Sequence, residues 1–305
     1  MAVTLQQLKA STQDRIAQGL ISELQASSLL LDRLTFADCV SAAGGSNLTY
    51  GYNRIKTPSK AGFRNLNNEY TASEAEFEAV SVELGILGGS YEIDRVVAAA
   101  TNGAPVDEVI MQLTEKRKAT VRAFNNAVIN GTKAAGRFDG LAKGLAGTAT
   151  EKTSTVDISD FDKMKANAIA FMYDFKQWLK LFARKPDMLL VSPMMATKLE
   201  TIASILGQYQ TKTSEAGRDY GTFAGIAVED LGAADETGKD VIDSEDIYGV
   251  CFGLEEFHGV TLAGGNGLSV YTPDFNSPGA VKKGEVEFVC ATALKATDLC
   301  QHFGH

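Results

Sequence analysis

The positions between Pro105 and Asn130 that are not strongly polar recur at the spacing of a helix that buries one face. They are Val106, Val109, Ile110, Leu113, Thr120, Val121, Phe124, Val128 and Ile129. Pro105 suits the first helical position, Asp107 suits the positively polarised first turn, and Gly131 is expected to end the helix in the left-handed conformation. At a rise of about 1.5 Å per residue the pattern predicts a rod of roughly 40 Å, on which other elements pack.

Two runs upstream of this helix alternate with the period of a strand. Residues 46–55 place Leu48, Tyr50 and Tyr52 on one face, and residues 77–93 align a second apolar row that includes Val80 and Val82. A polar stretch, 56–71, separates them, so we expect a long two-stranded excursion. Two strands alone are marginally stable, which favours a different chain as the second layer; the alternative is that the hairpin covers the chain's own long helix.

The N-terminal residues 3–34 show a helical recurrence of apolar residues, which predicts one or two short amphipathic helices. The recurring residues are Leu5, Leu8, Ile16, Leu20, Ile21 and Leu24, followed by Leu29 to Leu31. Two interpretations remain open for this arm: it docks on its own core, or it docks on a neighbouring subunit.

The second half of the chain alternates helix and strand patterns. After a turn-rich boundary at 131–155, Ser159 or Asp160 can cap an aromatic-striped helix that runs to about Ala183. Residues 186–191 predict a buried strand, and Ser192-Pro193 opens a third helix that Gly207 ends. This order suggests a compact α/β layer domain.

The remaining segments predict one long loop and several short strands. Residues 208–223 are polar and long enough to favour a role in function or partner contact. Residues 225–231, 247–252 and 260–262 are short strand candidates. The alternating stretch from residue 268 to 290 is expected to return and pair beside the long helix.

The composition is that of a folded protein: 305 residues, 45% hydrophobic and 22% charged, with 29 glycines against 6 prolines, which favours mixed α and β structure. A net charge of −9 argues against a chain built to grip nucleic acid. The cysteines, Cys39, Cys251, Cys290 and Cys300, show no paired spacing, and no signal peptide or membrane span is recognisable, so we expect reduced thiols and a cytoplasmic setting.

Candidate chemistry is sparse. The common nucleotide, protease, hydrolase and EF-hand signatures are absent. Residues 264–267 favour a turn over a phosphate cradle, and the acidic residues at 235–246 favour a solvated loop over a Ca²⁺ site. Cys300, His302 and His305 lie on what we expect to be a frayed tail, and His258 is the only other histidine. No catalytic residue, cofactor or metal is therefore assigned.

The order of these pieces resembles the major capsid protein of tailed bacteriophages, an α+β fold. The resemblance rests on 46-SNLTY-50, 62-GFR-64, 84-LGILGGSYEID-94, the long helix, 190-LVSP-193, 223-FAGIAV-228 and 247-IYGVCFG-253. It implies an N-terminal arm (1–45), an extended loop hairpin (46–97), a peripheral domain with the long spine helix (98–150), an axial domain (151–265) and return strands of the peripheral domain (266–305).

The resemblance also implies a structural role as hexamers and pentamers in an icosahedral head enclosing double-stranded DNA, located in the virion after assembly in host cytoplasm. A separate scaffolding protein, a portal protein and a decoration protein are the implied partners. Some relatives cross-link their subunits covalently through a lysine of the extended loop and an asparagine of the peripheral domain. Lys56 and Lys60 lie in the corresponding region, but no partner Asn aligns, so no enzyme activity is expected. Inter-subunit contacts are expected from Tyr50, Tyr52, Arg54, Lys56, Lys60, Phe63, Arg64, Tyr209, Arg218 and Tyr220.

Two alternatives stay open. One is an encapsulin-like nanocompartment shell with the same architecture and a protein cargo. The other is an α/β enzyme or binding module that uses the 208–223 loop and the 264–267 turn.

Overall fold

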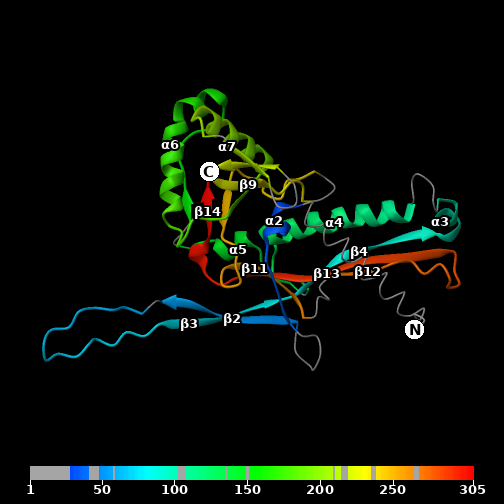
Figure 1. The fold of residues 1–305 in the computed structure, drawn as a ribbon, viewed down its shortest axis with the longest axis horizontal. Coiled ribbons are helices and arrows are strands. Elements are labelled where there is room, and N and C mark those ends of the chain that lie inside the picture. Colours follow the sequence, from blue (N-terminus) through cyan, green and yellow to red (C-terminus); the bar gives the residue numbers. More distant parts are fainter. Residues whose placement is uncertain are drawn as a thin grey trace.

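The computed structural model describes residues 28–40, 48–57, 59–101, 108–134, 136–148, 151–208, 210–213, 219–234, 238–263 and 268–305. They form a five-stranded sheet crossed by a long helix, a seven-stranded sheet with two helices, and a two-stranded hairpin that projects from the body (Figure 1). The predicted α+β class is confirmed. No helix in the described ranges is long and apolar enough to cross a membrane.

The five-stranded sheet is organised around its longest strand, β13 (Val281–Leu294). Its order is β1 (Phe36–Val40), β11 (Phe257–Leu262), β13, β12 (Leu268–Tyr271), with β4 (Gly85–Asp94) also paired to β13. The antiparallel register of β4 and β13 runs from Asp94 opposite Val281 to Gly85 opposite Cys290. Both strands contact the long helix, so the predicted return of the chain to this place is confirmed.

The long helix, α4 (Glu108–Asn130), has 23 residues and is therefore about 34 Å long. It follows the short helix α3 (Arg95–Thr101), and Val121, Phe124, Val128 and Ile129 are buried as the pattern predicts. Residues 105–107 lie outside the described part of the chain. The prediction that Gly131 adopts the left-handed conformation is wrong, because its φ is not positive. Glycine is needed there for a different reason: a Cβ would lie 2.4 Å from the Ala127 carbonyl oxygen and 2.6 Å from that of Phe138.

The seven-stranded sheet has the order β5 (Lys152–Thr153), β14 (Cys300–Gly304), β10 (Ile247–Val250), β6 (Met188–Val191), β9 (Ile226–Asp230), β8 (Asp219–Phe223), β7 (Gln210–Thr213). Alternate residues of β6 serve two cores. Leu189 and Val191 belong to the cluster under α6 (Phe161–Leu179) and α7 (Pro193–Ile205), whereas Met188 and Leu190 belong to the cluster shared with α4. This burial on both faces explains why β6 is a continuous apolar run.

The starts of both helices on this sheet follow from local sequence. The Asp160 carboxylate accepts a hydrogen bond from the Lys163 N–H at 2.9 Å, and the Ser192 hydroxyl accepts one from the Met195 N–H at 3.2 Å, with Pro193 in the first turn. Gly207, with φ of 65°, follows α7 as expected. The first of the two helices ends at Leu179, four positions before the predicted Ala183.

Strand pairing corrects two predicted assignments. Phe257–Leu262 was expected in the axial segment but pairs as β11 with β1 and β13. Cys300–Gly304 was expected among the peripheral return strands but pairs as β14 with β10 and β5. The chain enters the seven-stranded sheet at β5, returns to the five-stranded sheet through 251–256, and re-enters the seven-stranded sheet through 295–299, where the short 3₁₀ helix η1 (Thr297–Leu299) lies. The predicted boundary segment 131–155 also contains a buried helix, α5 (Leu141–Leu145).

The extended hairpin consists of β2 (Thr49–Thr57) and β3 (Glu76–Glu83), paired from Thr49 opposite Glu83 to Thr57 opposite Glu76. The prediction of two strands holds, but the second run does not continue to residue 93 within the hairpin. It breaks at buried Leu84, whose N–H bonds the Leu48 carbonyl at 2.8 Å, and β4 then joins the five-stranded sheet.

Two further segments bear on function. The described end of the predicted arm, α2 (Leu29–Arg33), buries Leu29, Leu30 and Leu31 in the chain's own core; residues 1–27 lie outside the described ranges. The polar segment 208–223 is not a plain loop, because its described parts form the β7–β8 hairpin, paired from Gln210 opposite Thr222 to Thr213 opposite Asp219.

Candidate assembly interface

The base of the extended hairpin is anchored on the chain's own core. The Tyr52 hydroxyl donates to the Leu294 carbonyl at 2.9 Å, and the Tyr50 ring meets buried His258 edge-on with ring centres 5.7 Å apart. Burial raises the pKa of Tyr52 against the opposing effect of nearby Arg54, so the phenol stays a hydrogen-bond donor. These contacts fix the direction in which the hairpin leaves the body.

The outer half of the hairpin has no such support from the residues that the structure describes. Ile55 and Phe77 form a cross-strand pair, yet 60% of Ile55 and 66% of Phe77 remain exposed. Figure 1 shows this half extending away from both sheets. An isolated two-stranded ribbon needs a second layer to bury such a pair, so the geometry calls for a surface outside this subunit.

The hairpin tip, residues 59–75, presents two apolar side chains from a locally ordered turn. Arg64 donates to the Asn68 carbonyl at 3.0 Å and its guanidinium lies 5.3 Å from the centre of the Tyr70 ring. Across the tip, the Lys60 N–H donates to the Ser73 hydroxyl at 3.0 Å. Phe63 and Leu66 project outward and are almost completely exposed. The tip therefore offers a shaped apolar anchor, which lowers the ordering cost of a contact.

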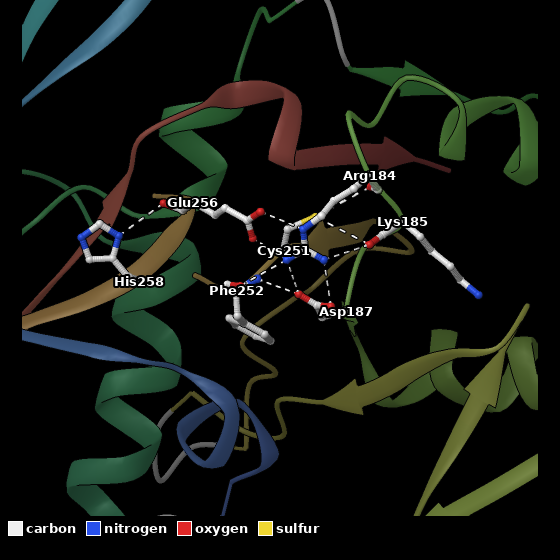
Figure 2. Close-up of polar contacts among 7 residues, drawn as sticks. All are labelled: Arg184, Lys185, Asp187, Cys251, Phe252, Glu256 and His258. Carbon is white, nitrogen blue, oxygen red and sulfur yellow. Dashed lines mark hydrogen bonds and ion pairs between the residues drawn. The ribbon is translucent and has the colours of Figure 1, made fainter. Parts of the chain in front are cut away.

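Arg184, between α6 and β6, ties the two sheets together (Figure 2). Its Nε donates to Glu256 Oε1 at 2.7 Å, and Nη2 bonds the other oxygen of that carboxylate. Its Nη1 and Nη2 donate to Asp187 at 3.0 and 2.7 Å, and Asp187 also accepts the Phe252 N–H at 2.8 Å. Because 252–256 links β10 of one sheet to β11 of the other, this fork holds the crossing point between the sheets.

The electrostatics of this crossing point match its geometry. Burial raises the pKa of Asp187, but hydrogen bonds from Arg184 and from the Phe252 N–H lower it by more, so the net pKa lies below its ordinary value. Hydrogen bonds to Glu256 and Asp187 raise the pKa of Arg184. Burial also raises the pKa of adjacent Cys251 to about 12, so that thiol is not a reactive thiolate.

Replacing Arg184 by methionine is expected to lower the free energy of unfolding by roughly 1–3 kcal/mol, because two partly buried carboxylates lose their counter-charge while the aliphatic stem is kept. Urea unfolding at neutral pH measures the loss. Lys185→Met is the matched control: within the described residues its ammonium donates one hydrogen bond, an exposed one to the Ala224 carbonyl, so a change below about 0.5 kcal/mol is expected. Equal losses in both variants would contradict the assigned role of Arg184.

The last residues of the described chain are held by charge and are not frayed, which corrects the expectation for this tail. His302, on β14, places Nδ1 3.0 Å from Glu151 Oε1 and Nε2 3.2 Å from Asp246 Oδ1; the second contact is an ion pair without hydrogen-bond alignment. Its ring stacks on Tyr248 with centres 5.0 Å apart. The side chain therefore clamps β14 between the segments that precede β5 and β10.

His305 extends this clamp. Its Nδ1 lies 3.1 Å from Glu245 Oε2 and its Nε2 lies 2.6 Å from the Val156 carbonyl oxygen, while buried Lys198 also pairs with Glu245. The acidic residues of this loop are thus partly neutralised by protein cations. Within the described ranges no group of three or more His, Cys, Asp or Glu residues could hold a metal ion, and 235–237 and 264–267 lie outside those ranges.

His302 predicts a pH dependence of stability. The nearby Asp246 carboxylate raises the pKa of His302 most, burial lowers it, and Glu151 raises it further, so the net pKa lies above its ordinary value. A raised pKa means that the stabilisation is complete below about pH 6.5 and is lost as pH rises through the folded-state value. We expect the free energy of unfolding of the wild type to exceed that of His302→Gln by roughly 1–2 kcal/mol near pH 6 and by less near pH 9.

The measurement for this prediction is urea unfolding of both proteins across that pH range. The difference between them is the informative quantity, because burial lowers the pKa of His258 and gives a contribution of opposite sign that both proteins share. A difference that grows toward alkaline pH would contradict the assigned ion pairs.

No family model and no curated protein matches this sequence. Solved structures do match, over nearly the whole chain. A chain of the holo-SrpI encapsulin complex from Synechococcus elongatus PCC 7942 has a TM-score of 0.61 at 13% identity, covering 90% of this chain and 86% of that one. The capsid of Myoviridae phage XM1 has a TM-score of 0.56 at 13% identity, with 90% and 91% covered. The virus-like particle from Pyrococcus furiosus has a TM-score of 0.57 at 12% identity, covering 96% of this chain and 99% of that one.

The chain has the tailed-phage capsid fold. The expectation drawn from the resemblance is thereby confirmed at the level of fold.

Seven of the ten predicted contact residues have described side chains, and these occupy three settings. Tyr50, Tyr52 and half-buried Arg54 lie at the hairpin base, and Lys60, Phe63 and Arg64 lie at the exposed tip. Tyr220 is engaged within the chain: its hydroxyl accepts from Arg33 at 2.7 Å. Tyr209, Arg218 and the side chain of Lys56 fall outside the described part of the chain. All ten remain predictions as inter-subunit contacts, with the tip residues the ones left available.

Several residues of the candidate interface and its support were missed by sequence reasoning. The sequence could have identified Ile55, Leu66 and Phe77, since each is a large apolar residue in a predicted strand or turn that has no second layer. Arg184 carries no local signal, because its partners Phe252 and Glu256 lie about seventy positions away in the chain.

Proposed function

We propose that this chain is the major capsid protein of a tailed bacteriophage, a structural protein that assembles as hexamers and pentamers into the icosahedral head around double-stranded DNA. The observation that carries the proposal is the hairpin that leaves Ile55, Phe63, Leu66 and Phe77 exposed on a shared capsid and shell fold. A free subunit gains nothing from such an extension, whereas a lattice of subunits gives each hairpin a neighbouring surface.

The parts of the chain can be assigned to the parts of the capsid fold. We propose the arm at 1–45, the extended loop at 46–97 and the spine-helix domain at 98–150, with the axial domain formed by 151–256 and β14 and the return strands by 257–294. Heterologous contacts of this kind close into rings when the rotation between subunits is a fraction of a full turn. Many modest contacts then add up to a stable shell through avidity.

The shell would enclose DNA without reading its sequence. A net charge of −9 disfavours adhesion of phosphates to the protein, which suits a container that later releases its genome. A scaffolding protein, a portal protein and a decoration protein are the further partners proposed, with assembly in host cytoplasm and residence in the virion. A purely structural role, without catalysis, accords with the absence of any recognised catalytic motif in the sequence.

The second candidate is the shell of an encapsulin-like nanocompartment, because the encapsulin chain from Synechococcus elongatus matches with a TM-score of 0.61. The contents of particles purified from the native source discriminate the two. Nuclease-resistant double-stranded DNA supports the capsid, whereas a co-purifying cargo protein without DNA supports the compartment.

The deciding experiment for self-assembly is expression of the full chain, followed by sedimentation and negative-stain electron microscopy, alone and with a scaffolding protein encoded beside it. Closed shells, tubes, or isolated hexamers and pentamers are expected. A monomer or small dimer under both conditions, with a melting temperature that responds to a small ligand, would overturn the proposal in favour of an α/β enzyme or binding module.

A further inference from the structure

The end of α4 farthest from the hairpin lies beside α3 (Figure 1). An apolar pocket lies between these two helices. It has a volume of about 710 Å³ and its lining is mostly apolar: Val96, Ala98 and Ala99 of α3, Val109 and Ile110 of α4, and Phe275 from the turn before β13, with Arg95 as the one charged residue among the described lining residues. Exposed fractions of 69% for Val96 and 41% for Phe275 leave its walls open to water. Exposed apolar surface of this kind marks a place where another segment packs.

The chain carries a segment of matching chemistry. Residues 1–27, outside the described ranges, have the apolar recurrence of an amphipathic helix, and their charged residues are two basic and two acidic. The residues of the apolar stripe are Leu5, Leu8, Ile16, Leu20, Ile21 and Leu24. An overall neutral segment with one apolar face is suited to an apolar pocket and has no net charge to direct it to a charged surface.

The point at which this segment leaves the described structure places it near the pocket. Ser28 caps α2, and its hydroxyl lies 3.4 Å from Asn125 Oδ1 on α4; the next residue, Leu29, donates its N–H to Glu229 at 3.1 Å. Asn125 and Ile110 are separated by about 22 Å along the helix axis. A helix formed by the 27 residues would reach about 40 Å. The segment is therefore long enough to run back along α4 to the pocket.

We propose that residues 3–24 dock their apolar stripe into the α3–α4–Phe275 pocket of the same subunit. This contact would support the outer end of α4, which α3 alone covers incompletely. It needs no shell and so goes beyond the proposed assembly function. Another occupant, the same segment of a second copy, is a separate outcome of the test.

The test is disulfide trapping in the full chain with Cys39→Ser, leaving buried Cys251, Cys290 and Cys300 in place. Val96→Cys is combined in turn with Leu5→Cys, Leu8→Cys and Ile16→Cys, and each pair is oxidised in dilute protein. At least one pair is expected to form a bond within the monomer at least about tenfold faster than the same N-terminal cysteine paired with Ile169→Cys, which is 76% exposed on α6. Mass spectrometry identifies the bonded peptides.

Each other result counts against the proposal. A dimer linked between Val96→Cys and the N-terminal segment would assign the pocket to a second copy. Equal rates for the Val96→Cys and Ile169→Cys pairs would show that the segment does not dock here. Because the bond is scored by monomer mass, the result is independent of shell formation, and an absence of shells does not affect it.

A second measurement guards against a misplaced cysteine. In the full chain, Ile16→Asp with Leu20→Asp is expected to speed amide hydrogen exchange in α3 and the first turns of α4, while the control Gln13→Asp with Gln18→Asp, which adds the same charge at polar positions, leaves exchange unchanged. Unchanged exchange in α3 with the first pair would overturn the docking. Phe275→Asp, which alters the pocket itself, is expected to reproduce the faster exchange.

Discussion

Replacing Trp178 by alanine is expected to lower the free energy of unfolding by about 3–5 kcal/mol. Trp178 lies on the buried face of α6 and is fully buried, with its ring centre 5.4 Å from that of Phe175, 5.1 Å from that of Phe182 and 5.3 Å from that of Phe303. The ring also covers Gly249, where a Cβ would lie 2.9 Å from the indole. Truncation therefore leaves a cavity between helix and sheet that no neighbouring backbone can close.

Urea unfolding followed by far-UV circular dichroism measures this loss, since the only tryptophan of the chain is removed. Tyr173→Ala, on the exposed face of the same helix, is the control and is expected to change stability by less than about 0.5 kcal/mol. Trp178→Phe should cost much less than alanine, because it keeps an aromatic ring and removes an indole N–H that has no hydrogen-bond partner within the described structure. A loss below about 1 kcal/mol for Trp178→Ala would contradict the packing argument.

The double change Phe63→Ser with Leu66→Ser is expected to abolish or strongly weaken particle formation while leaving the folded subunit intact. Both side chains are exposed at the hairpin tip and support nothing within the chain. Anchors in an interface core are worth about 1–2 kcal/mol or more each, so the protein concentration needed for assembly should rise at least about tenfold. Sedimentation across a dilution series measures that concentration.

The control for this effect is Thr71→Ser with Ala72→Ser. It also introduces two serines into the exposed tip, but it removes no large apolar side chain. It is expected to assemble as wild type does, and the free energy of unfolding of both variants should stay within about 0.5 kcal/mol of the wild-type value. Normal assembly of the Phe63 and Leu66 variant would exclude the tip as an anchor without excluding a shell built through other surfaces.

The element boundaries could be predicted wherever a short stretch contains its own signal. The spine helix, the Asp160 and Ser192 caps and the two strands of the hairpin follow from periodicity and capping, which depend on neighbours three or four positions away. The unsupported outer half of the hairpin could also be anticipated, because a two-residue period states which face is apolar and the chain offers no nearby element to cover it.

Strand partners could not be predicted in the same way. A two-residue period says which face of β11 or β14 is buried, but not which strand lies beside it, so both were placed in the wrong sheet. The same limit applies to Gly131, whose requirement comes from the carbonyl of Phe138 and not from its own dihedral angle.

The sequence by itself determined the long helices, the projecting hairpin and the resemblance that leads to a capsid-type fold, because all of these depend on local order along the chain. Only the tertiary structure decided that Arg184 holds the crossing between the sheets, that His302 and His305 clamp the last strand, and that an apolar pocket opens at the end of α4. These features join residues far apart in sequence, and the energy of such contacts depends on distance in space, on which sequence spacing carries no information.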